Sequence, residues 1–196
     1  MKKSVFLLAT SLSLILPGAA CAAGWTGNLN GFIGGKALDD NDWFADEQAE
    51  VGARLDFRRT NWPISIATDV HFSSGDFNGY VFFPSSGVRY YKEDVETCEF
   101  NVGVRKYWDA VSNMHPFVGG GLAYVQLDAK GTVDGTTSLS DKGNGVGVWL
   151  NGGITWTLNA FNIGFDVRYT QAEVGLDAGD FEGGGGHAGV LLGYHW

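Results

Sequence analysis

Apolar and polar side chains alternate with a period of two along most of this chain, which is the pattern of β-strands with two different faces. In one clear case Val51 and Leu55 fall on one face, and Glu50 and Arg54 fall on the other. The composition of 30 glycines and only 4 prolines also favours strands separated by turns. Eight strands are therefore predicted, at 25–38, 49–58, 62–73, 95–108, 117–128, 146–156, 161–170 and 187–196.

The connections between these strands alternate between two lengths. Three are short, at 59–61, 109–116 and 158–160, and four are long and acidic, at 39–48, 74–94, 129–145 and 171–186. Short turns at one end and long loops at the other predict an antiparallel up-and-down arrangement. Within the second long loop, strand-like segments 80–83 and 88–91 flank a turn. We interpret them as a hairpin that extends the third and fourth strands, with a pair of extra strands, giving ten, as the alternative.

Aromatic residues gather at the strand ends that meet the short turns. Five of the seven tryptophans lie there, each in the two-residue register of its segment's apolar side chains. Indole rings collect where hydrocarbon meets water, so this arrangement indicates one interfacial belt of a bilayer-spanning barrel. We predict a girdle at the short-turn, periplasmic end that contains Trp25, Trp62, Trp108, Phe117, Trp156, Phe161, Tyr194 and Trp196.

A soluble ligand-binding barrel is the main alternative, with the same apolar face turned inward. The apolar register of the strand-end aromatics and the alternation of loop lengths both argue against it. The polar face also lacks the mixture of Lys, Glu and Thr that is typical of a solvated sheet. We therefore predict an all-β fold, an eight-stranded antiparallel up-and-down transmembrane β-barrel.

With the apolar face outward, the charged residues point into the lumen. An eight-stranded barrel has an interior only wide enough for side chains to fill, and charges in such a space must pair. The expected lumen network contains Glu50, Arg54, Asp56, Arg58, Asp69, His71, Glu99, Arg105, Asp166 and Arg168. We prefer a self-neutralising plug built from these ion pairs. A narrow gated channel, in which the ion pairs exchange partners, is the alternative.

Two strands need particular attention when their faces are assigned. In 117–128 we place Ala123, Val125 and Leu127 on the lipid face, opposite Tyr124 and Gln126. In 146–156 the alternation places a tryptophan at position 149 on the lumen face, where an indole must fit among charges.

The first 22 residues are predicted to be a cleaved secretory signal. A basic start precedes an apolar run that is too short to span a bilayer, and Ala20, Cys21 and Ala22 form a small-x-small cleavage site. A lipoprotein acylated on Cys21 is the alternative. The barrel then covers 23–196. Removal of the two lysines in the signal leaves 11 basic against 22 acidic residues, and such acidity argues against nucleic acid as a partner.

The whole segment 23–196 resembles the small outer-membrane barrels of the OmpA transmembrane domain and OmpX kind. The run 116–125 is similar to a short-turn exit and strand start in that family, and Tyr194 and Trp196 resemble its terminal assembly signal. Leu191 stands where the family usually has glycine. The resemblance implies the outer membrane of a Gram-negative bacterium, contact with its lipid and lipopolysaccharide, and insertion by the barrel-assembly machinery.

Candidate chemistry is sparse in this sequence. His71 and Ser73 resemble the His-x-Ser pair of lipid A deacylases, but an ordinary lumen histidine and a strand-end serine explain them more simply. Carboxylates in the long loops could bind divalent cations, although solvation of the loops is the preferred interpretation. We expect a monomer without a cofactor or catalytic residues that serves membrane architecture or surface interaction. A lipid A modifying enzyme is the more distant alternative.

Overall fold

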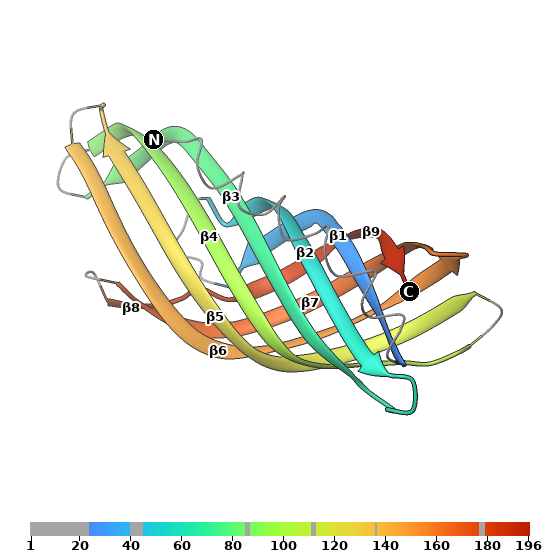
Figure 1. Ribbon diagram of the computed structural model, residues 1–196. Helices are drawn as coiled ribbons and strands as arrows, with labels where there is room; N and C mark the ends of the chain where they lie inside the picture. The colour runs from blue at the N-terminus through green and yellow to red at the C-terminus, as the bar shows by residue number, and fades with distance from the viewer. Residues whose placement is uncertain (1–23, 40–44, 85–86, 111–112, 136, 177–178) are drawn as a thin grey trace, which may run out of the picture.

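The computed structural model describes residues 24–39, 45–84, 87–110, 113–135, 137–176 and 179–196 (Figure 1). The predicted signal, 1–22, lies outside these residues. The strands are β1 (Trp25–Leu38), β2 (Glu47–Arg59), β3 (Ser65–Phe83), β4 (Gly87–Tyr107), β5 (Met114–Val133), β6 (Thr137–Leu158), β7 (Phe161–Leu176), β8 (Gly179–Glu182) and β9 (Gly185–His195). Within the same residues no helix has the length and hydropathy needed to cross a bilayer.

Eight of the strands form a closed antiparallel ring. Each of β1 to β7 pairs with the next along the chain, and β9 pairs with both β7 and β1. The short β8 pairs only with β7 and stands outside the ring. The predicted eight-stranded up-and-down barrel is therefore confirmed.

Four strands of the ring rise far above the others at the long-loop end. The β3–β4 pairing continues to Phe83 and Gly87, whereas β2 ends its pairing with β3 at Ser74. The segments 75–83, 87–95, 129–133 and 137–141 form what we call the upper sheet, which projects past the rest of the barrel (Figure 1). The two strand-like segments of the second long loop extend β3 and β4 as predicted, so they add no ninth and tenth strand to the ring.

The two faces of the barrel differ as a membrane protein requires. Large apolar side chains point away from the ring, and Ile33, Leu150 and Val167 are each about two-thirds exposed. Charged side chains point inward, and Arg54 and Arg105 are almost fully buried. A soluble barrel would show the reverse, because exposed apolar surface on this scale is unfavourable in water. The outward apolar belt therefore faces hydrocarbon.

The expected face assignment of the fifth strand is wrong. Ala123, Val125 and Leu127 are at most 2% exposed and point into the barrel, whereas Leu122 and Tyr124 point outward. The error arose because the interior of β5 is itself apolar, so that both of its faces carry apolar side chains. The inward position of the tryptophan at 149 agrees with the prediction, since this residue is 3% exposed.

Glycines on the inner face allow β4 and β5 to approach each other closely. A Cβ added to Gly121 would lie 2.1 Å from the carbonyl oxygen of Val102 and 2.5 Å from Cα of Gly103. Both atoms belong to the backbone and cannot swing away. Glycine inside a strand often marks such an approach.

We expect Gly121→Ala to lower the free energy of unfolding by about 1–3 kcal/mol, the usual cost of overpacking. Gly31→Ala is the control, because a Cβ there meets only the carbonyl oxygen of Leu192, at 3.6 Å. Urea unfolding in detergent micelles, followed by tryptophan fluorescence, measures both variants. Equal stability of the two would contradict the close approach of β4 and β5.

Candidate functional site in the barrel interior

The interior nearest the short-turn end contains two arginines and three aspartates. Arg105 lies 2.7 Å from Asp69 and 3.3 Å from Asp56. Arg54 lies 2.9 Å from Asp166 on the opposite wall, with its Nε 3.8 Å from Asp69. All five side chains are at most 1% exposed. Every charge here therefore has an opposite charge beside it, which buried charges need to be tolerated.

A second cluster lies nearer the long-loop end and is centred on Glu50. Arg168 donates to Glu50 over 2.8 Å, and ring nitrogens of His71 and His187 lie 2.9 Å from its two carboxylate oxygens. Lys36 donates to Glu99 over 2.7 Å. These groups come from β1, β2, β3, β4, β7 and β9, so the cluster joins six strands of the ring.

Aromatic rings separate and cover the charged groups. Phe117 lies under the guanidinium groups of Arg54 and Arg105, whose Cζ atoms are 5.1 and 5.9 Å from the centroid of its ring. The Cζ atom of Arg105 is also 5.6 Å from the centroid of the Trp149 ring. At these distances the ring faces attract the cations. Phe117 was expected in the outer girdle, and this expectation is wrong. Its side chain is 2% exposed, because position 117 belongs to the inward register of β5.

The other expected lumen residues can now be located. Nine of the ten predicted residues are buried in the two clusters, the exception being Arg58. Arg58 is half-buried at the short-turn end and donates to the carbonyl of Trp62. Sequence reasoning missed Lys36 and His187 in the second cluster, and Tyr107, which donates to Asp56. The inward two-residue register of β1 carried the signal for Lys36, which shares it with Asn28 and Asn30.

An apolar layer lies inside the barrel at the long-loop end. Its side chains are buried and come from β1, β4, β5, β7 and the segment before β2: Leu38, Ala45, Val95, Val125, Leu127, Ala129 and Val174. Lys36 also donates to the carbonyl of Gly183, which holds the chain before β9 against this layer. We call this layer of seven apolar residues the apolar cap.

At the short-turn end the lumen opens into a polar cavity of about 340 Å³. Tyr107 donates to Asp56 over 2.8 Å at its inner end, and Asn28 donates to the same carboxylate. His115 and His195 line the wall. Among the described residues, no three His, Cys, Asp or Glu side chains converge as a metal site. The first acidic loop lies largely outside those residues, at 40–44.

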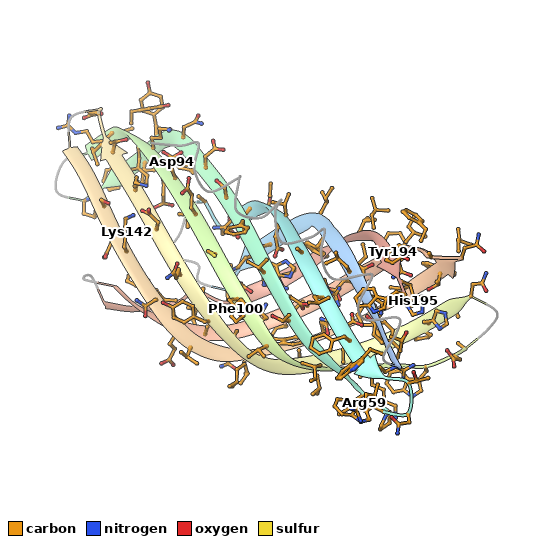
Figure 2. All side chains as sticks on the ribbon, in the orientation of Figure 1. Arg59, Asp94, Phe100, Lys142, Tyr194 and His195 are labelled. Carbon is orange, nitrogen blue, oxygen red and sulfur yellow. The ribbon has the colours of Figure 1, made fainter. Side chains whose placement is uncertain are left out.

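The remaining residues of the expected girdle lie at the short-turn end. Trp62, Trp108, Phe161 and Tyr194 are 38–50% exposed. Trp25 packs edge-on against Trp62, with centroids 5.7 Å apart, and Trp156 packs against Phe165. The last residue, Trp196, stacks on Tyr194. Figure 2 shows Tyr194, His195 and Arg59 together at this end of the molecule.

The His-x-Ser pair is directed into the lumen and is engaged there. His71 binds Glu50, and Ser73 donates to Gln48 over 2.7 Å. The two residues are 1% and 7% exposed. A lipid acyl chain outside the barrel therefore has no direct access to either side chain.

The closed ring, the outward apolar belt and the charged interior together define a transmembrane β-barrel of the bacterial outer-membrane type. Solved structures share this fold. OprG of Pseudomonas aeruginosa is similar with a TM-score of 0.65 and 14% identity, over 89% of this chain and 96% of that one. Ail of Yersinia pestis, in complex with the heparin analogue sucrose octasulfate, is similar with a TM-score of 0.56 and 13% identity, over 88% and 99%. No protein-family model and no curated protein matches this chain.

Proposed function

We propose that this protein is a closed outer-membrane barrel, whose lumen is filled by an ion-pair plug and whose role is architecture and surface interaction. The observation that carries the proposal is the burial of three arginines across the lumen, each paired with carboxylates of other strands. Arginine suits this role, because its rigid fork of donors holds two acceptors at once. The long-loop end, with the upper sheet, then faces the cell exterior.

Two separate layers oppose conduction. A hydrated ion entering from the short-turn side would have to break the contacts of Arg105 with Asp56 and Asp69. Beyond the Glu50 cluster it would meet the apolar cap, where Val95, Val125 and Val174 are fully buried and offer no polar partner. Leaving one member of a buried ion pair without its partner costs about 3–5 kcal/mol. This supports a closed barrel over the narrow gated channel.

We expect no steady single-channel conductance from refolded wild-type protein in planar bilayers. Glu50→Gln should leave the bilayer equally silent, because the apolar cap remains in place. A steady conductance that changes in Glu50→Gln or Arg105→Gln would contradict the plug and favour the channel. Heat-dependent gel mobility checks that each sample is folded before it is recorded.

Surface interaction is supported by the outward face of the upper sheet. Its tip exposes Tyr80, Phe82 and Val88, at 78%, 68% and 65%, and Tyr80 packs edge-on against Tyr90. Tyr90, which pairs with Tyr80, stands ten residues along β4 from the outward-facing Phe100. That is roughly 33 Å of strand at 3.3 Å per residue, or about 25 Å of height for a strand tilted by about 40°. Aromatic side chains at that height are outside the bilayer, and exposed apolar patches of this kind favour contact with another molecule.

We also propose that the barrel is not an enzyme. Ser73 and His71 are turned into the lumen and bound to other partners, so this pair does not face lipid as a nucleophile and its base. The contacts of His71 with Glu50 and of Ser73 with Gln48 stabilise the barrel interior instead.

A further inference from the structure

A groove of about 620 Å³ crosses the outer wall of β2 to β6 where the barrel passes into the upper sheet. Strand pairing arranges the outward side chains there in three lateral rows. The lower row is Ala53, Val70, Phe100, Tyr124 and Val146. The middle row is Val51, Phe72, Cys98, Gln126 and Asn144, and the upper row is Ala49, Ser74, Glu96, Asp128 and Lys142. The groove is lined by the middle and upper rows.

The outward side chains change from apolar in the lower row to polar and charged in the upper row. The lower row is apolar throughout except for the phenol of Tyr124. In the middle row Val51 and Phe72 continue the apolar belt, but Gln126 and Asn144 add two amides to the same row. The upper row carries charge. The hydrocarbon boundary therefore passes through the groove itself. In Figure 2 Lys142 lies nearer the upper sheet than Phe100 does.

Short side chains make the wall hollow at this height. Cys98 is next to Phe72 in the middle row, and Ala49 and Ser74 are the small members of the charged upper row. A lipid head group and the start of an acyl chain together need a surface that is polar above and apolar below. The groove has this order and is open to the outer leaflet.

The charged edge of the groove is asymmetric. Lys142 and Lys130 both bind Asp128, over 2.6 and 3.2 Å, on the β5–β6 side. Glu96 lies on the β4 side of the same row. An anionic group is therefore attracted towards Lys142 and repelled from Glu96.

We propose that this groove binds lipopolysaccharide of the outer leaflet through its phosphorylated sugar head. A phosphate lies at Lys142, the sugar hydroxyls contact the amides of Gln126 and Asn144, and an acyl chain packs on Phe72 and Val51. Charge-assisted hydrogen bonds from an ammonium to a phosphate are among the stronger polar contacts. The groove is on the outer wall, so lipid binding does not depend on whether the lumen conducts. A negative result in the lipid experiment would therefore leave the closed-barrel proposal standing, and a conducting lumen would leave the lipid site standing.

Native mass spectrometry of the folded protein, released from detergent with added lipid A or phosphatidylglycerol, tests the proposal. We expect one retained lipid A and at least tenfold weaker retention of phosphatidylglycerol. Ser74→Trp fills the groove and should weaken lipid A binding at least tenfold. Val190→Trp is the matched control, because Val190 is also an outward belt residue but lies on β9, outside the groove.

Two surface variants give opposite expected shifts. Lys142→Ala should weaken lipid A binding several-fold, whereas Glu96→Gln should strengthen it about twofold by removing a repelling charge. Gel mobility before and after heating confirms folding of every variant. Retention of lipid A by Ser74→Trp at the wild-type level, or equal retention of phosphatidylglycerol by the wild type, would overturn the proposal. The second outcome would mean that ordinary phospholipid fills the groove.

Discussion

Arg105→Ala is expected to lower the free energy of unfolding by about 3–5 kcal/mol, since it leaves buried charges without a partner. Arg105 is fully buried and holds both Asp56 and Asp69. Removal of the guanidinium leaves Asp69 with only the Nε of Arg54, at 3.8 Å. Equilibrium unfolding by urea in detergent micelles, followed by tryptophan fluorescence, provides the free energy.

Arg89→Ala is the matched control for this change. Arg89 pairs with Asp134 over 3.1 Å in the upper sheet, where both side chains are more than one-third exposed. Exposed pairs of this kind contribute about 0–1 kcal/mol. If Arg105→Ala were no more destabilising than Arg89→Ala, the interior would have to be hydrated enough to solvate the two aspartates, and the plug would be wrong.

Phe117→Ala is expected to cost about 3–5 kcal/mol, the usual range for a phenylalanine removed from a packed interior. The ring fills the space between Arg54 and Arg105 and also packs against Tyr107, with centroids 5.3 Å apart. Phe161→Ala removes the same side chain from the outer girdle, where it is 50% exposed. We expect a loss of about 1 kcal/mol there, in proportion to the smaller buried area.

The same urea experiment compares these two variants. A small loss in Phe117→Ala, matching that in Phe161→Ala, would mean that Phe117 belongs to the girdle after all. A large loss supports its position among the arginines. The comparison thus tests the one girdle residue that the structure moves to the interior.

Alternation of side chains was sufficient to predict the fold. The predicted strand 25–38 coincides with β1, and the ring contains the predicted eight strands. Strand ends at the long-loop side were less predictable: β6 begins at Thr137, nine residues before the predicted start. Above the membrane neither face of a strand is required to be apolar, so the two-residue pattern fades while the backbone pairing continues.

The candidate site was predictable as a set of charges but not as a set of pairs. Glu50, Arg54 and Arg168 follow from the inward register of β2 and β7. Their partners do not, because Arg54 reaches Asp166 across the lumen and the distance depends on how far the strands are staggered around the ring. The prediction for Phe117 was wrong for another reason. Both faces of β5 carry apolar side chains, so the pattern did not show that position 117 belongs to the inward register.

The pairing of β1 with β9 has a consequence for how the chain folds. Asn28 and His195 lie side by side although 167 residues separate them, and Gly27 and Trp196 exchange backbone hydrogen bonds. Contacts between such distant positions form slowly, because the entropy of closing a long loop must be overcome first. Until they form, β1 and β9 each present an unpaired edge that can template aggregation. We therefore expect closure of the β1–β9 seam to be a slow, late step in forming the ring.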